Sequence, residues 1–240
     1  MTPEEPNQSA STSDFEFAAL SEAKNYRAAL LAEFAPYLQG SIIEIGAGIG
    51  QITTELLRQP RVERVLSIEP DTDLCRRFRE RLPAQPLLEG TIEQAPTGQA
   101  WQAILSINVL EHIRDDEPEL ARYRKLLAGQ DGHLCLFVPA RPEIYAPIDK
   151  DFGHHRRYTR DELRAKLEHA GFELVRLRYF NWVGYFAWWL SFCLLRKRGF
   201  DIGAVRLFDR AIFPPVFWME TKLFSPPIGQ SLLAVARARA

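Results

Sequence analysis

The chain lacks the features that would draw it to nucleic acid or direct it to export. Its 30 Lys and Arg residues are balanced by 31 Asp and Glu residues, so the formal net charge is −1 and no global basic field attracts a nucleic acid. The three cysteines, Cys75, Cys135 and Cys193, lie far apart, and their odd number argues against a disulfide framework. We therefore expect no nucleic-acid partner and a reducing, cytoplasmic location.

The chain also lacks an apolar run of the roughly 20 residues that span a bilayer. An uncharged aromatic stretch covers residues 182–195 and is followed at once by three basic residues, 196–198, while a second apolar stretch, 212–219, is interrupted by two prolines. This composition fits a buried helix, a homodimer surface, or a helix in the membrane interface, where Trp inserts and basic residues meet headgroups. The last alternative predicts peripheral contact with the inner face of the membrane through residues 182–198.

Length and composition indicate one domain rather than two. A chain of 240 residues can form one α/β domain with a large core, but it is too short for two full-sized domains with linkers. Residues 1–14 are rich in Pro, Glu, Ser and Thr and lack the apolar core of a signal peptide, so we expect a disordered tail there. Residues 15–240 are expected to form the domain, with a substrate-side loop at 140–158 and a helical aromatic insert at 181–228.

Strand-like and helix-like stretches alternate from residue 41 onward, which is typical of a doubly wound parallel α/β sheet with helices on both faces. Asp71 and either Asp115 or Asp116 are available as helix caps, and Thr159 opens a capping-box pattern before a helix that stops at Gly171. One or two further helices are expected within residues 15–37. The predicted strands are 41–46, 64–69, 86–89, 102–107, 133–138, 172–180 and 231–238, and the other predicted helices are 50–59, 71–81 and 115–128.

The most informative stretch, residues 41–50, is a β-branched apolar run that ends in three glycines, Gly46, Gly48 and Gly50. Glycine permits positive φ and a close approach of backbone to ligand, and the isoleucines are typical of a strand buried on both faces. The next predicted strand ends in Glu69, an acid about 20 residues further on that is suited to accept both ribose hydroxyls of an adenosine. The pattern predicts an adenosine-bearing cofactor.

Glu44 helps to decide which cofactor this is. The glycines follow the spacing G-x-G-x-G, whereas a dinucleotide fingerprint is G-x-G-x-x-G. A carboxylate at Glu44 would repel phosphate oxygens, but it can hold the ammonium group of an amino-acid moiety, directly or through water. We therefore favour S-adenosylmethionine, and a nicotinamide-dependent oxidoreductase stays the alternative.

Four motifs that follow the first four predicted strands carry a resemblance to a known family: Glu44-Ile-Gly-Ala-Gly-Ile-Gly50, Glu69, Glu89-Gly90-Thr91 and Asn108-Val-Leu-Glu-His-Ile113. In their order and spacing, residues 41–180 resemble a class I S-adenosylmethionine-dependent methyltransferase. The resemblance implies a mostly parallel seven-stranded Rossmann-like sheet, S-adenosylmethionine as methyl donor and S-adenosylhomocysteine as product. It also implies that the glycine turn passes under the methionine part of the cofactor, that Glu69 binds the ribose, and that Asn108 faces the methionine group.

The resemblance is weaker beside the adenine. Thr91 stands where such enzymes often have an acid, so a hydrogen bond to the adenine amino group is not implied, whereas Ile92 is expected to line the ring. His112 lies one turn after Asn108 and is either a cofactor-side residue or a packed histidine. Tyr26, on the N-terminal helix, either closes over the cofactor or belongs to the core.

The substrate-side loop, 140–158, is long for an α/β connection and dense in functional side chains. His154 or His155 is suited to take a hydroxyl proton near neutral pH, and Tyr158 is a third catalytic candidate. An alternative is that the loop's two arginines anchor it to nearby carboxylates. Adjacent histidines point apart, and no third ligand stands at helical spacing, so we expect no metal. The candidate substrate-binding residues are Tyr145, Arg156 and Arg157.

We expect methyl transfer to a small, apolar or lipid-linked acceptor, at an oxygen atom. The expectation about the acceptor rests on the aromatic insert and its basic flank. Residues 153–159 followed by such an insert also resemble bacterial methyltransferases of lipid-linked or cell-envelope glycan pathways. A non-catalytic S-adenosylmethionine-binding or scaffold protein, with the insert as its partner surface, is the alternative from a different class.

Overall fold

The computed structural model describes residues 21–129 and 131–238 of the chain. The predicted disordered tail, residues 1–14, lies outside the described residues. The division into one domain with a loop and an insert stays a prediction, although the described residues share a single sheet.

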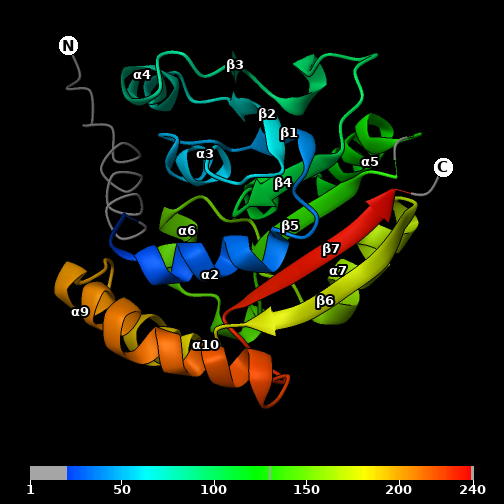
Figure 1. The fold of residues 1–240 in the computed structure, drawn as a ribbon. Helices are drawn as coiled ribbons and strands as arrows, with labels where there is room; N and C mark the ends of the chain where they lie inside the picture. Colours follow the sequence, from blue (N-terminus) through cyan, green and yellow to red (C-terminus); the bar gives the residue numbers. More distant parts are fainter. Residues whose placement is uncertain (1–20, 130, 239–240) are drawn as a thin grey trace, which may run out of the picture.

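Seven strands form one sheet in the order β3-β2-β1-β4-β5-β7-β6 (Figure 1). The first five strands pair in parallel, and β7 runs antiparallel to both β5 and β6. The predicted doubly wound, mostly parallel seven-stranded sheet is thus confirmed. The strands are β1 Gly40–Ile45, β2 Val62–Glu69, β3 Leu87–Glu89, β4 Ala103–Ile107, β5 His133–Pro139, β6 Phe172–Phe180 and β7 Ser231–Ala238.

Helices cover both faces of the sheet (Figure 1). Ile42 and Ile43 are neighbours on β1, so their side chains point to opposite faces, and both are fully buried. Ile42 packs with the side that contains α2 (Lys24–Phe34) and α3 (Gln51–Leu56), and Ile43 packs with α5 (Asp116–Leu127) and α7 (Arg160–His169). Burial of each isoleucine contributes about 1.5–3 kcal/mol, which explains the continuous apolar pattern of this strand.

The predicted helix caps are confirmed in two cases and wrong in one. Asp71 accepts hydrogen bonds from the N–H groups of the first turn of α4 (Thr72–Arg81), and Thr159 does the same for α7. At the start of α5, neither Asp115 nor Asp116 caps the helix: Asp115 makes no capping hydrogen bond, and the carboxylate of Asp116 is held by side chains from other segments, among them Lys166. Long-range ion pairing outweighs local capping there.

The aromatic insert forms three helical segments at one end of the molecule (Figure 1). These are α8 (Trp182–Trp188) with a π-helical turn to Leu194, α9 (Ile202–Leu207) with a π-helical turn to Ile212, and α10 (Phe213–Lys222). The two prolines of the second apolar stretch lie in the first turn of α10, where a missing N–H costs nothing. Among the residues described, no helix is both long enough and apolar enough to cross a bilayer.

The predicted substrate-side loop is more ordered than its sequence indicates. It contains a 3₁₀ turn, Pro142–Ile144, and a short helix, α6 (Pro147–Asp151). Ile144 and Ile148 from this loop are buried against Trp188 and Phe192 of the insert. The loop and the insert therefore pack as one unit beside the carboxyl ends of β4 and β5.

Candidate active site

The glycine turn lies at the point where the strand order reverses, between β1 and β4, which is where parallel α/β sheets bind ligands. Gly46, Gly48 and Gly50 all have positive φ, at 70°, 54° and 78°. A Cβ atom at Gly46 would collide with Val109, and one at Gly50 would lie 2.8 Å from Leu82 Cδ1. Glycine is required at both positions, by conformation and by space.

Glu44 is a buried acid beneath this turn. One of its oxygens accepts hydrogen bonds from Thr53 Oγ1 at 2.6 Å and Ser67 Oγ at 2.9 Å. The other oxygen, Oε1, has no hydrogen-bond partner among the described residues. Burial, opposed in part by these two hydroxyls, raises the pKa of Glu44 to about 7. A cationic group bound beside Oε1 would satisfy it and favour the ionised form.

Glu69 ends β2 and lies against the same turn. Its carboxylate accepts from the N–H of Gly48 at 2.8 Å and from the N–H of Asp71 at 3.0 Å. Burial raises the pKa of Glu69, although these two N–H groups oppose the shift. Glu44, Glu69, the glycine turn and Asn108 line one cavity of about 370 Å³, which we name the turn cavity.

Not every predicted cofactor residue lies in the turn cavity. Thr91 is hydrogen-bonded to Gln94, Ile92 is packed in the core, and Gly50 is the N-cap residue of α3. None of the three lines the turn cavity. Tyr26 lies edge-on to Phe137 and Phe180 and lines a different cavity. His112, in contrast, does line the turn cavity. The structure thus brings together the polar residues that follow β1, β2 and β4.

A second cavity of about 350 Å³ adjoins the first, and Asn108 and Phe152 line both. We name it the insert cavity, because most of its wall comes from the aromatic insert. The wall is largely apolar. Its polar side chains come from the loop and the end of β4, and also from the insert, among them Ser191, Lys197 and Asp201. Its apolar lining includes Tyr26, Phe137, Ala187, Trp188, Phe192, Val205 and Phe208, and its polar lining includes Asn108, Glu111, His154 and Arg157.

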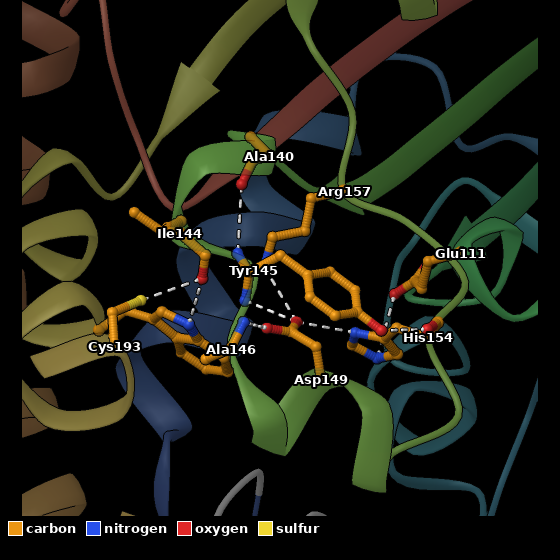
Figure 2. Close-up of polar contacts among 10 residues, drawn as sticks. Glu111, Ala140, Ile144, Tyr145, Ala146, Asp149, His154, Arg157 and Cys193 are labelled. Carbon is orange, nitrogen blue, oxygen red and sulfur yellow. Dashed lines mark hydrogen bonds and ion pairs between the residues drawn. The ribbon is translucent and has the colours of Figure 1, made fainter. Parts of the chain in front are cut away.

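His154 is the one predicted catalytic residue that lines the insert cavity. Its ring Nδ1 lies 3.0 Å from Asp149 Oδ1, and the same oxygen accepts from Arg157 Nε at 2.9 Å (Figure 2). Burial by itself would raise the pKa of Asp149, but the His154 hydrogen bond and the Arg157 charge hold it below its usual range. Asp149 therefore orients the imidazole and leaves Nε2 directed away from it.

The remaining loop candidates support the fold. Tyr158 is fully buried, and its hydroxyl donates to Asp116 at 2.8 Å, while Arg156 pairs with the same carboxylate. His155 is exposed, and its backbone N–H bonds to Glu111. Tyr145 donates to the backbone oxygen of His154. None of the four lines either cavity.

Arg157 is also held in place. It donates to Asp149 and to the carbonyl of Ala140 at 3.2 Å, and its guanidinium lies 4.4 Å from the ring centroid of Trp188. The anchoring alternative thus describes both arginines of the loop, although Arg157 still lines the insert cavity.

Glu111, His112 and His154 meet between the two cavities. Each offers one ligand atom, and the three atoms lie within 4.8 Å of one another. His154 Nε2 is 4.0 Å from Glu111 Oε1 (Figure 2). Burial, with the nearby His154 and His155, lowers the pKa of His112 to about 4, so its ring is neutral near pH 7.

A glycine turn over a buried acid, an acid at the end of β2 and this strand order are together the pattern that the sequence predicted for a methyl-donor site. The sequence profile of the family described as methyltransferase domain matches residues 19–177, well over half of the chain. The chain belongs to this methyltransferase family.

The methyltransferase is similar to proteins in several organisms. An uncharacterized methyltransferase of Bacillus mycoides strain KBAB4 is 27% identical over 163 residues, which cover 60% of this chain and 76% of the relative. Two solved structures share the fold: an S-adenosylmethionine-dependent methyltransferase from Mesorhizobium loti (TM-score 0.59, 16% identity, 87% and 95% covered) and one from Archaeoglobus fulgidus (TM-score 0.57, 15% identity, 92% and 94% covered). The family match confirms the predicted methyltransferase, and the family and fold together imply a cofactor of the S-adenosylmethionine type.

Sequence reasoning missed three residues that line or support the two cavities. Glu111 was part of a motif but had no role, Phe152 joins the two cavities, and Asp149 orients His154. A signal existed for Glu111 alone, since it directly precedes His112 after the fourth strand. Phe152 and Asp149 act through contacts that only the folded loop creates.

Proposed function

We propose that the methyltransferase transfers a methyl group to a hydroxyl of a small, apolar or lipid-linked acceptor that lies in the insert cavity. The observation that carries this proposal is the meeting of the two cavities at Asn108 and Phe152. A donor in one cavity and an acceptor in the other would present their reacting atoms to each other there. Such alignment supplies much of the rate enhancement of a displacement reaction.

The residues of the turn cavity fit S-adenosylmethionine. The unpartnered Oε1 of Glu44 is suited to the ammonium group of the methionine part, and the positive φ of Gly46 and Gly48 lets the backbone of the turn line the cavity. Glu69, at the end of β2, would accept hydrogen bonds from the ribose hydroxyls. These bonds would replace the one that it now accepts from the N–H group of Gly48. Thr91 and Ile92 stay predictions for the adenine end.

The insert cavity fits an acceptor with an apolar body and one polar end. Aromatic side chains of the insert would cover the apolar part, while the polar end would lie against Asn108, Glu111 and His154. Bound S-adenosylmethionine supplies a methyl group on a sulfonium, whose carbon–sulfur bond breaks with the electron pair left on sulfur. The residues of the chain would hold the hydroxyl in line with that bond, and the hydroxyl would lose its proton at the polar end.

An experiment on the acceptor cavity tests this proposal. Extracts incubated with the enzyme and isotopically labelled S-adenosylmethionine would reveal the labelled acceptor by mass spectrometry. Ala187 is exposed and lines the insert cavity, so Ala187→Trp adds a large side chain at the cavity's rim and should lower transfer to that acceptor by about tenfold or more, with unchanged affinity for S-adenosylhomocysteine. The matched control is Ala28→Trp, the same change on the exposed side of α2, which should behave as the wild type.

Two outcomes would overturn the proposal. Full transfer by Ala187→Trp would place the acceptor elsewhere. Tight binding of NADH without binding of S-adenosylhomocysteine would contradict S-adenosylmethionine as the methyl donor. The methylated atom, read from the fragmentation of the product, distinguishes oxygen from nitrogen, carbon or sulfur.

We also propose that the outer face of the insert contacts the inner face of a membrane, where a lipid-linked acceptor resides. Of the 13 large apolar side chains that are exposed among the described residues, ten lie between residues 186 and 224. Trp189 and Leu194 are each about half exposed and are followed in sequence by the basic residues 196–198, of which Arg198 pairs with Asp151. Aromatic side chains next to basic ones are typical of an interfacial segment that binds anionic lipid. A homodimer through the same face is the competing arrangement.

A further inference from the structure

We propose that Glu111, His112 and His154 bind one divalent transition-metal ion, such as Zn²⁺, Co²⁺ or Mn²⁺, between the cofactor and the acceptor. This inference rests on the proposed function, because it assigns the polar end of the insert cavity to a cation. Two imidazoles and one carboxylate are a ligand set that such ions favour over Mg²⁺, which prefers oxygen ligands.

The three side chains reach the same point from separate segments. Glu111 and His112 lie on the 3₁₀ turn that follows β4, and His154 comes from the loop after β5. Their ligand atoms lie within 4.8 Å of one another, so each would move inward by about 1 Å to reach metal–ligand distances of about 2.0–2.2 Å. The prediction of no metal rested on the adjacent pair His154 and His155, whereas the fold brings Glu111 and His112 to His154 from the turn after β4.

The strongest single observation is the orientation of His154. This side chain is more than nine-tenths buried, and its Nε2 atom has no hydrogen-bond partner among the described residues. Asp149 holds the other ring nitrogen at 3.0 Å, which directs Nε2 toward Glu111 (Figure 2). A carboxylate behind a histidine is the usual support of a metal ligand, because it fixes the ring and increases its basicity.

His112 has a comparable support. The backbone of Gly153 hydrogen-bonds its ring, and the rings of His112 and His154 lie 4.7 Å apart at an angle of 84°. Backbone carbonyls are common partners of metal-bound histidines. Both imidazoles are thus held by groups outside the cluster, with their remaining nitrogens available within it.

The location of the cluster suits the ion to bind the acceptor hydroxyl. Glu111 and His154 line the insert cavity, while His112 lines the turn cavity, so an ion between them borders both. Three protein ligands leave at least one position open for the acceptor hydroxyl. Coordination promotes loss of the hydroxyl proton to solvent water, after which the oxygen bonds to the methyl carbon as the carbon–sulfur bond breaks and sulfur keeps the electron pair.

Metal binding can be measured without any acceptor. The full chain is treated with a chelator and dialysed against Zn²⁺ or Co²⁺, and bound metal is counted by elemental mass spectrometry while the Co²⁺ visible spectrum is recorded. We expect one ion per chain and a Co²⁺ spectrum typical of nitrogen ligation. His154→Ala and Glu111→Gln should each weaken binding by at least about tenfold, as expected for loss of one of three ligands.

The matched control is His155→Ala, which removes the exposed neighbour of His154 and should bind the ion as the wild type does. Circular dichroism confirms that each variant is folded, and the Co²⁺ spectrum of the wild type tests the site even if a variant is not. Absence of stoichiometric binding by the wild type, or unchanged binding by both cluster variants, would overturn the proposal.

A second measurement separates this proposal from the function on which it rests. Once an acceptor is known, removal of the ion should lower methyl transfer by at least about tenfold and its return should restore it, with affinity for S-adenosylhomocysteine unchanged. Full transfer by the metal-free enzyme would leave the methyltransferase function intact and make His154 a proton acceptor in place of a ligand. Loss of S-adenosylhomocysteine binding would instead contradict the donor site.

Discussion

The turn cavity and the insert cavity are built in different ways. The turn cavity is formed by the segments at the ends of β1, β2 and β4, within residues 44–112, together with Phe152 of the loop after β5. The insert cavity is formed by side chains from residues 23–231, which belong to α2, the loop after β5 and the insert. The first depends on local backbone conformation, and the second depends on long-range packing. Substitutions should therefore separate donor binding from acceptor binding.

The largest effect is expected at the glycine turn. Gly46→Val places a branched side chain against Val109 at a residue with φ 70°, so the turn must move. Affinity for S-adenosylhomocysteine, measured by calorimetry, should fall by about 100-fold or more, which is about 2.7 kcal/mol or more. Gly98→Ala is the control, since Gly98 also has positive φ but has nothing within 4 Å of its added Cβ atom. Equal losses in both variants would mean that strain, and not cavity shape, governs binding.

The next effect is expected where the insert meets α2. The buried carboxylate of Asp209 accepts from the N–H groups of Asn25 at 3.0 Å and Tyr26 at 2.8 Å, and so caps α2 from a distant segment. Asp209→Ala should lower the free energy of unfolding by about 1–3 kcal/mol and weaken acceptor turnover more than cofactor affinity. Urea denaturation and S-adenosylhomocysteine titration measure the two quantities.

The control is Glu22→Ala, which removes an exposed ion pair between Glu22 and Arg206 of the insert. It should change neither the free energy of unfolding nor the acceptor turnover. If Asp209→Ala instead abolished cofactor affinity, the two cavities would not be independent.

A pH effect is expected in the turn cavity. Burial raises the pKa of Glu44 to about 7 from the usual 4.5, so the folded state holds a proton that the unfolded state loses. Stability should therefore fall as pH rises from about 4.5 to about 7, by on the order of 3 kcal/mol, and Glu44→Gln should remove this dependence.

Cofactor affinity should have the opposite trend. The ionised form of Glu44 binds an ammonium group, so affinity for S-adenosylhomocysteine should fall by about tenfold per pH unit below pH 7. Glu44→Gln should bind weakly at every pH between 5 and 8. A pH-independent affinity of the wild type would show that Glu44 does not contact the amino group.

The smallest effect is expected at the outer face of the insert. Neutralising Arg196, Lys197 and Arg198 together should lower cosedimentation with anionic liposomes several-fold, about 1 kcal/mol in total, because Arg198 already pairs with Asp151. Trp189→Ser should weaken binding to neutral and anionic liposomes alike, since it removes inserted apolar area. Equal pelleting of all variants, together with a dimer in solution, would favour a protein interface.

Much of the fold was predictable because its signals are local. Runs of β-branched residues indicate the buried strands. Asp71 and Thr159 cap their helices by accepting hydrogen bonds from N–H groups two or three residues further on. The donor site shares this property, since the glycines and Glu69 follow their strands directly. The role of Asp116 was not predictable from local sequence, because the side chains that bind it, among them Tyr158 and Lys166, lie more than 40 residues away.

The apolar runs and the glycine spacing by themselves predicted a parallel α/β sheet, and Glu44 and Glu69 predicted an adenosine-bearing cofactor at its edge, because conformational demands on glycine and the periodicity of buried strands act residue by residue. Only the tertiary structure decided that His154, and not His155 or Tyr158, lines the insert cavity, and that Glu111 and His112 stand beside it. Those relations depend on how segments distant in sequence pack together, and such contacts cannot be read from the spacing of neighbouring residues.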